Sequence, residues 1–182
     1  AYNMAMKMDR RAFLKTSAAM AVAVSMTGLL GGCSDGAIGT DFGLFQATAG
    51  AATCGTNADG WGSSPESGWE GYIKVKVRIK DTSGMKKPDP LRARTFFFLK
   101  INGQLVESYT DGGLLSNGGY IKLEEGQFKE DWMCVTLKED QKALYEAVAA
   151  KKAEVTFAIS SARTTENYKL DYATETFVKQ TV

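Results

Sequence analysis

The residue types that most often carry out chemistry in proteins are sparse in this chain, and one of them is missing. The 182 residues include no histidine, which removes Ser-His-Asp and Cys-His catalysis and the commonest imidazole ligands of metal ions. Two adjacent acidic pairs occur, Glu124 with Glu125 and Glu130 with Asp131. Neighbouring residues of a strand point to opposite faces, so neither pair is placed to act as the acid and base of a glycosidase. We therefore expect no enzyme, no cofactor and no metal site.

Cys33 follows a stretch that has the parts of a removable targeting peptide. Arg10 and Arg11 form a positively charged start, residues 16–30 are mostly apolar and uncharged, and two glycines precede the cysteine. The apolar run is shorter than the roughly 20 residues of a membrane-spanning helix. The alternative is a cytosolic protein with a buried N-terminal helix, although a core helix seldom begins with two arginines and ends in Gly-Gly-Cys.

Two motifs in this stretch resemble those of exported bacterial lipoproteins. Arg10, Arg11, Phe13 and Leu14 match the twin-arginine export motif, with Asp9 where that motif usually has Ser or Thr. Residues 30–33 are similar to the lipobox, in which the cysteine is diacylated through its sulfur and the chain is cut before it. The resemblance implies a signal peptide at 1–32, a lipidated tether at 33–41 and a domain at 42–182. It also implies that Cys33 anchors an extracytoplasmic protein to the cell membrane or to an outer membrane.

The two other cysteines, Cys54 and Cys134, form an even pair once Cys33 is taken by lipid. An oxidising compartment then favours one disulfide between them. In the chain-entropy model, a bridge over so long a span would stabilise the fold by about 4 kcal/mol. Two buried thiols are the alternative. The pair lacks CxxC spacing, so we expect no redox or zinc role.

The charge of the chain argues against a nucleic-acid partner. The chain has 22 Lys and Arg and 21 Asp and Glu, and residues 1–32 hold four of the basic and one of the acidic residues. The remaining 150 residues therefore have a formal net charge of −2, whereas nucleic-acid binding needs a clustered basic excess. A length of 150 residues suits a single domain.

Residues 72–80 have the clearest strand pattern. Ile73, Val75, Val77 and Ile79 alternate with Lys74, Lys76, Arg78 and Lys80, which predicts a half-buried strand with one basic face. Further strands are predicted at 42–53, 95–101, 104–110, 120–123, 127–137, 154–160 and 170–179. Strands in this number, separated by turn signals, predict an all-β protein.

Two further signals refine this prediction. Asn102 and Gly103 lie between two strands and predict a type I′ hairpin turn, because both residues tolerate positive φ. Apolar residues recur at helical spacing in 138–152, which predicts one short amphipathic helix. The expected architecture is an immunoglobulin-like antiparallel β-sandwich with one inserted helix.

The order of these strands resembles the telokin-like, immunoglobulin-fold domains of bacterial surface lipoproteins. Residues 71–80, 98–103 and 153–159 carry the resemblance. It implies a sandwich over residues 42–180 and contributes no catalytic residues, and the inserted helix departs from the simplest form of that family.

Two groups of residues are candidates for binding. Lys74, Lys76, Arg78 and Lys80 could dock an anionic surface, or form an ordinary solvated face beside Glu and Asp of neighbouring strands. Trp61 and Trp69 lie within the glycine-rich loop predicted at 55–71, and they could contact a sugar or a protein, or fold back over one end of the domain.

These observations predict a membrane-anchored binding module with no catalysis. Its expected partners are the membrane, which it contacts through its lipid, and a protein or glycan ligand. The alternative is a structural or accessory subunit of an envelope complex. One form of this alternative places the chain beside an exported redox enzyme, because the twin-arginine route carries folded cargo.

Overall fold

The computed structural model describes residues 38–56 and 69–181. Its elements are β1 (Thr40–Asp41), β2 (Phe45–Thr56), β3 (Trp69–Asp81), β4 (Leu91–Arg92), α2 (Ala93–Phe96), β5 (Phe97–Ile101), β6 (Gln104–Val106), β7 (Tyr109–Thr110), β8 (Tyr120–Ile121), β9 (Phe128–Lys138), η3 (Glu139–Gln141), α3 (Lys142–Ala149), β10 (Val155–Ser160), β11 (Thr165–Asp171) and β12 (Thr176–Lys179). Within these ranges, each helix falls short of the length and apolar character that crossing a membrane requires.

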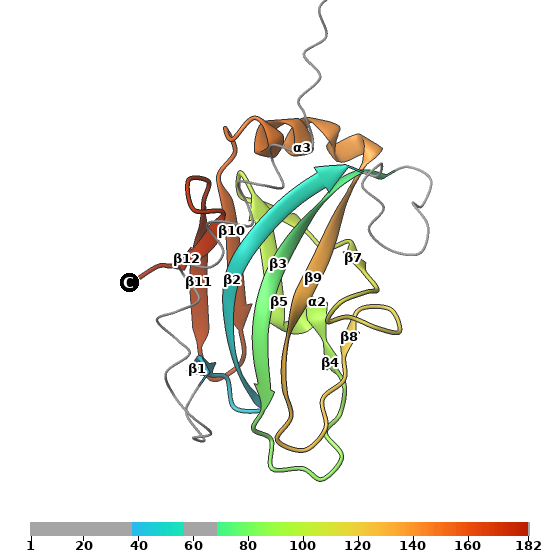
Figure 1. Ribbon diagram of the computed structural model, residues 1–182, viewed down its shortest axis with the longest axis vertical. Helices are drawn as coiled ribbons and strands as arrows, with labels where there is room; N and C mark the ends of the chain where they lie inside the picture. The colour runs from blue at the N-terminus through green and yellow to red at the C-terminus, as the bar shows by residue number, and fades with distance from the viewer. Residues whose placement is uncertain (1–37, 57–68, 182) are drawn as a thin grey trace, which may run out of the picture. The chain divides into compact units, whose positions relative to one another are not determined.

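Nine strands form one antiparallel sheet in the order β6-β5-β10-β11-β12-β2-β3-β9-β7, with β1 added beside β2. The sheet is strongly curled into a half-barrel (Figure 1). Only Glu107 and Ser108 separate its two edge strands, β6 and β7, along the chain, and β6 also lies against β9. The prediction of a mainly β, antiparallel protein with one short helix is confirmed. The described residues form this single curled sheet and a two-stranded pair, β4-β8, rather than the two stacked sheets of a sandwich.

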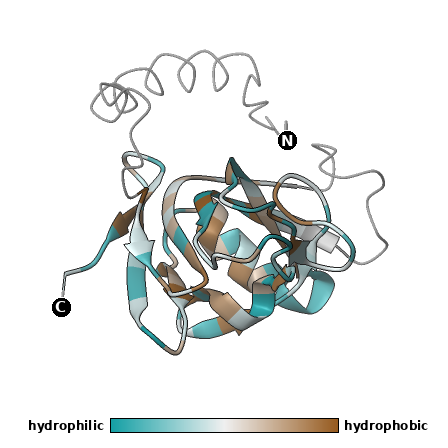
Figure 2. Ribbon diagram, turned by 90° about the horizontal axis from the view of Figure 1, so that it is seen from below, coloured by the Kyte–Doolittle hydropathy of each residue, from teal (hydrophilic) through white to brown (hydrophobic). Residues whose placement is uncertain are grey.

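The core fills the inside of the curl. Strand residues that point inward are apolar and those that point outward are polar, so hydrophobic and hydrophilic residues interleave along the ribbons (Figure 2). Phe45 stacks on Phe97, Phe97 on Phe157, and Phe157 packs against Phe177, with ring centroids 5.6–6.1 Å apart. This row joins β2, β5, β10 and β12 across the interior, because strands distant in the sheet face one another once the sheet curls.

The predicted strand and hairpin around β3 and β5 are confirmed. Ile73, Val75, Val77 and Ile79 are buried on the core side of β3, as the alternation predicts. Asn102 and Gly103 connect β5 to β6 with φ of 50° and 79°, which are the positive values of a type I′ turn.

The predicted helix at 138–152 is shorter than expected. The 3-10 turn η3 precedes the eight residues of α3, which cover one end of the curled sheet (Figure 1). A Cβ atom at Gly71 would collide with the ring of Tyr145 and with the carbonyl oxygen of Gly55. A glycine in β3 is therefore what lets α3 approach the sheet.

The strand predicted at 170–179 is two strands. Residues 165–171 form β11, a tight turn with Glu175 at φ 53° follows, and β12 returns antiparallel from Thr176. The sequence pattern missed β11 because two of its inward positions hold polar side chains, Glu166 and Tyr168.

A basic and aromatic surface on the convex face of the sheet

The four basic residues of β3 lie on the convex face of the sheet, and β9 places two aromatic residues and an acid beside them. Trp132 is directly opposite Lys76, Glu130 is opposite Arg78, and Phe128 is opposite Lys80. Directly opposed residues of antiparallel strands share a face. We call this surface the basic–aromatic strip, and its members are Lys74, Lys76, Arg78, Lys80, Phe128, Glu130 and Trp132.

Cation–π contacts organise the strip. The ammonium group of Lys76 lies 5.3 Å from the centroid of the Trp132 ring, and the guanidinium group of Arg78 lies 5.9 Å from that of Phe128. Lys74 lies 4.7 Å from the ring of Tyr72, two residues before it in β3. Contacts of this kind are worth roughly 0.5–1 kcal/mol each at exposed sites. They restrict the conformations of the long basic side chains and keep them along the convex face of the sheet.

One ion pair crosses the strip. The Arg78 Nε atom lies 2.6 Å from the Glu130 Oε2 atom, as an ion pair without hydrogen-bond alignment. In the part of the chain that the structure describes, Lys76 and Lys80 form no ion pair. Arg78 is therefore paired with an acid of the neighbouring strand, as expected for an ordinary solvated face. Lys76 and Lys80 are not neutralised in this way.

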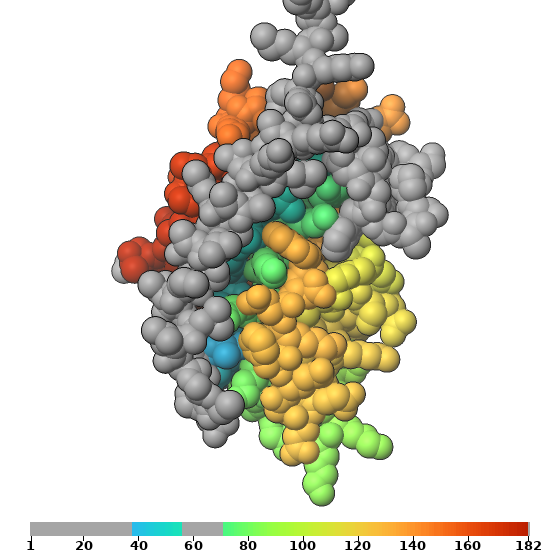
Figure 3. All heavy atoms as spheres, viewed as in Figure 1, coloured from blue at the N-terminus to red at the C-terminus, as the bar shows by residue number. Residues whose placement is uncertain are grey.

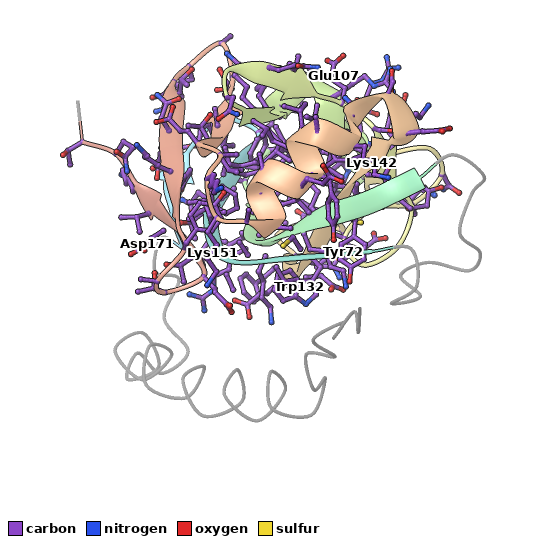
Figure 4. The ribbon with its side chains drawn as sticks, turned by 90° about the horizontal axis from the view of Figure 1, so that it is seen from above. Tyr72, Glu107, Trp132, Lys142, Lys151 and Asp171 are labelled. Atoms are coloured by element: carbon purple, nitrogen blue, oxygen red, sulfur yellow. The ribbon has the colours of Figure 1, made fainter. Side chains whose placement is uncertain are left out.

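The strip lies at the surface of the described residues, with Phe128 and Glu130 exposed and its other members partly exposed. Side chains of β9 and β3 form the centre of the face seen in Figure 3. Figure 4 looks along the sheet from the α3 end and shows Tyr72 and Trp132 on its outer side. Phe128 is 45% exposed, which is high for a ring of its size.

Several predicted site residues lie outside the described residues. They are Cys33 and the export residues Arg10, Arg11, Phe13 and Leu14, together with Trp61. Trp69 begins β3, where its backbone pairs with Lys138 of β9, and the position of its side chain is outside the description. The signal peptide, the lipid anchor and the tryptophan contact therefore stay predictions.

The predicted disulfide between Cys54 and Cys134 is wrong. Cys54 lies in β2 and Cys134 in β9, with β3 between them. Two strand spacings put about 10 Å between their backbones, beyond the roughly 7 Å that a disulfide spans. Cys54 is opposite Ile73, whereas Cys134 is opposite Lys74, so the two thiols also point to opposite faces. Burial raises the pKa of the Cys134 thiol, and the positive charge of nearby Lys74 offsets only part of this effect, which leaves the pKa at about 12. The thiol therefore stays protonated near neutral pH.

A polar cluster that the sequence analysis missed bridges the gap between β11 and β2. The two parts of the sheet on either side of this gap are joined by a single strand pair, Thr176 with Ala51. Beside this pair, the Tyr168 hydroxyl donates to Glu166 Oε1 at 2.6 Å and lies 3.2 Å from the Thr48 hydroxyl of β2, which can donate to it. The Lys179 ammonium lies 3.4 Å from the same Glu166 oxygen. The cluster thus substitutes for missing strand pairing.

The chemistry of this cluster is structural. Burial and the hydrogen bond to Glu166 raise the pKa of Tyr168 to about 12, so its hydroxyl remains a donor near neutral pH. A shallow groove of about 300 Å³ lies beside the cluster, lined by residues that include Thr40, Asn167 and Lys179. Among the described residues, no group of three His, Cys, Asp or Glu side chains is placed to hold a metal ion.

Comparisons with protein-family models, curated proteins and solved structures gave no match. The resemblances to exported lipoproteins and to telokin-like domains stay predictions, and the choice of a binding surface rests on the geometry of the described residues.

Proposed function

We propose that this chain is a membrane-anchored, extracytoplasmic binding module without catalysis, which holds an acidic glycan on the basic–aromatic strip. The observation that carries the proposal is the register of β3 and β9, which sets Lys76 over Trp132 and Arg78 over Phe128. The lipid anchor is supported by the resemblance of residues 30–33 to a lipobox.

The charge of the strip favours an anionic ligand. It holds four cations and one acid, Glu130, although the chain after residue 32 is slightly acidic as a whole. The positive charge is therefore local. A local positive surface draws an anionic ligand to one place and sets its orientation.

The shape and spacing of the strip favour an extended polymer with sugar rings. Alternate residues of a strand are about 6.6–6.8 Å apart, so the cations form a row that can pair with acidic groups recurring along a chain. Trp132 and Phe128 add apolar ring edges beside that row, and aromatic side chains suit the apolar faces of sugars. Because the cations already lie across the rings, less side-chain entropy is lost on binding.

A titration with polygalacturonate, a polymer of an acidic sugar, tests this function. The variant Lys76→Gln/Lys80→Gln removes the two lysines of the strip that form no ion pair among the described residues. At about 0.2–1 kcal/mol for each exposed charge contact, we expect roughly tenfold weaker binding.

The matched control is Lys100→Gln/Lys152→Gln, which removes the same charge at two exposed positions outside the strip. This control should bind like the wild type, and the neutral polymer dextran should bind to neither protein. Equal weakening in both double variants would show a nonspecific charge effect and contradict the proposal.

The anchor is tested separately by growing cells with a labelled fatty acid. We expect label on the wild-type chain, and loss of both label and membrane association in Cys33→Ala. Label that persists in Cys33→Ala would contradict the assignment of the anchor.

A further inference from the structure

Three of the exposed large hydrophobic side chains gather at one end of the sheet. Leu44, Met85 and Phe128 are 46%, 38% and 45% exposed. They come from the segments before β2, after β3 and at the start of β9, which meet at the end opposite α3 (Figure 1). We call this end the apolar tip.

Hydrogen bonds between the three segments fix the apolar tip. The Thr82 amide donates to the Leu44 carbonyl at 3.1 Å, and the Asp81 amide donates to the Gln127 carbonyl at 2.9 Å. Lys80, the last strip residue of β3, is directly opposite Phe128. The three apolar side chains therefore belong to neighbouring segments, although more than 80 residues separate the first from the last.

The buried carboxylate of Asp81 makes the tip rigid. It accepts hydrogen bonds from the Ser83 hydroxyl at 2.7 Å and from the Gly126 amide at 2.9 Å. The Ser83 hydroxyl in turn accepts from the Met85 amide at 3.2 Å. The loop that carries Met85 is thus tied to the loop before Phe128, and the apolar side chains are exposed on a preformed support.

Two further features surround the tip. Lys80 is opposite Phe128, and the exposed Lys86 and Lys87 follow Met85 in the chain. Their long stems can run along an apolar layer while the ammonium groups stay in water. Acidic residues, Glu124 and Glu125 among them, are nearby too, so apolar contact rather than net charge must supply most of the attraction.

We propose that the apolar tip docks on a phospholipid bilayer, with Leu44, Met85 and Phe128 in the headgroup layer. Amphipathic helices that lie in a membrane interface bury apolar side chains at the headgroup layer with lysines beside them, and the tip offers the same combination on loops. Three half-exposed side chains fall far below the roughly 800 Å² per partner that a stable protein interface buries. They also come from segments at strand ends rather than from one long edge strand, so they offer little backbone for an added strand. The proposal shares the membrane location with the proposed function, and it shares Lys80 and Phe128 with the basic–aromatic strip.

Depth-dependent fluorescence quenching tests the docking directly. The full chain with Cys33→Ser and Cys54→Ser receives one environment-sensitive fluorophore, at Met85→Cys or, as control, at Val178→Cys. Val178 is 46% exposed on β12, away from the tip, and buried Cys134 should not be labelled. The probe is a vesicle of phosphatidylcholine and phosphatidylglycerol that contains brominated acyl chains. We expect quenching at position 85 and none at position 178.

A second pair of variants tests the role of the apolar side chains. Adding Leu44→Ser to the protein labelled at position 85 should reduce its quenching at least about twofold, because half-exposed leucine surface leaves the contact. Adding Leu105→Ser, which changes an exposed leucine of β6, should leave the quenching unchanged. The N-terminal segment is the same in all variants, so differences between them report on the tip.

Three results would overturn the proposal. They are no quenching at position 85, equal quenching at both positions, or equal effects of the two serine substitutions. A protein partner in place of lipid would give the first result. The Leu44→Ser chain keeps the whole basic–aromatic strip, so its polygalacturonate binding should match the wild type. That comparison separates failure of the docking from failure of the glycan assignment.

Discussion

The carboxylate of Asp81 provides the sharpest test of how the apolar tip is held. It is buried at the end of β3 and accepts three hydrogen bonds, from the Ser83 amide and hydroxyl on Oδ1 and from the Gly126 amide on Oδ2. In Asp81→Asn, one oxygen becomes an NH₂ donor. The asparagine side chain can keep its oxygen toward Ser83, which preserves two of the three hydrogen bonds. Its NH₂ group then faces the Gly126 amide, and because both groups are donors, no hydrogen bond forms between them.

The size of the loss follows from the kind of bond that is removed. A hydrogen bond to a charged group contributes about 1.5–3 kcal/mol, and a buried group left without a partner costs a similar amount. We expect Asp81→Asn to lower the free energy of unfolding by about 2–3 kcal/mol at neutral pH. The control Asp89→Asn removes the same charge from an exposed position nearby, and it should change the free energy of unfolding by less than about 0.5 kcal/mol.

The pH dependence gives a second check. Burial alone would raise the pKa of Asp81, but the hydrogen bonds from Gly126 and Ser83 outweigh it and hold the pKa below the ordinary 3.8. The stability that the carboxylate contributes is therefore present above the ordinary pKa and is lost as the pH falls through the lowered one. Urea unfolding at neutral pH and at about pH 2 should show the difference between wild type and Asp81→Asn shrinking in acid. A difference that is absent at neutral pH, or equal at both pH values, would refute this account.

Two other substitutions and one chemical reagent test the rest of the fold. Tyr168→Phe removes the hydroxyl that joins Glu166 to the Thr48 hydroxyl, so urea unfolding should show a loss of about 1–3 kcal/mol. An unchanged midpoint would mean that the gap between β11 and β2 does not depend on this cluster. Gly71→Ala forces a methyl group against Tyr145 and Gly55, so it should lower the free energy of unfolding by about 1–3 kcal/mol. The control is Gly84→Ala, at an exposed glycine with positive φ and open space around it. This control should lose only about 1 kcal/mol, from backbone strain. Cys134 is buried and its pKa is raised to about 12. It should therefore resist alkylation at pH 8 in the folded chain and react after unfolding, as mass spectrometry of its peptide would show. Rapid labelling of Cys134 in the folded chain would contradict its burial.

The elements that the sequence predicts well are those whose signal is local. Strict alternation in β3 and the Asn102-Gly103 turn depend on neighbouring residues, and both are confirmed. The basic face of β3 is predicted by the same alternation. Its partners Trp132 and Phe128 are not, because the register between β3 and β9 is a property of residues more than 45 positions apart.

The features that the sequence does not predict depend on how distant segments meet. The curl of the sheet brings the edge strands β6 and β7 together and joins β12 to β2 at one residue pair. Sequence periodicity says nothing of this curvature. The disulfide prediction failed for the same reason: compartment and cysteine count suggest a pair, but the intervening strand β3 keeps Cys54 and Cys134 apart. The strand β11 was not predicted because Glu166 occupies one of its core-facing positions, and a carboxylate there interrupts the alternation of apolar residues that indicates a strand.

The binding role of the strip is tested most directly by nuclear magnetic resonance of the full chain titrated with short galacturonate oligomers. We predict that the shifted signals cluster on the amides of β3 and β9 around Lys76 and Arg78 and on the indole N–H of Trp132, and that Lys76→Gln reduces these shifts. Shifts centred instead on the groove beside Glu166 and Lys179, or no shifts at all, would contradict the assignment of this surface.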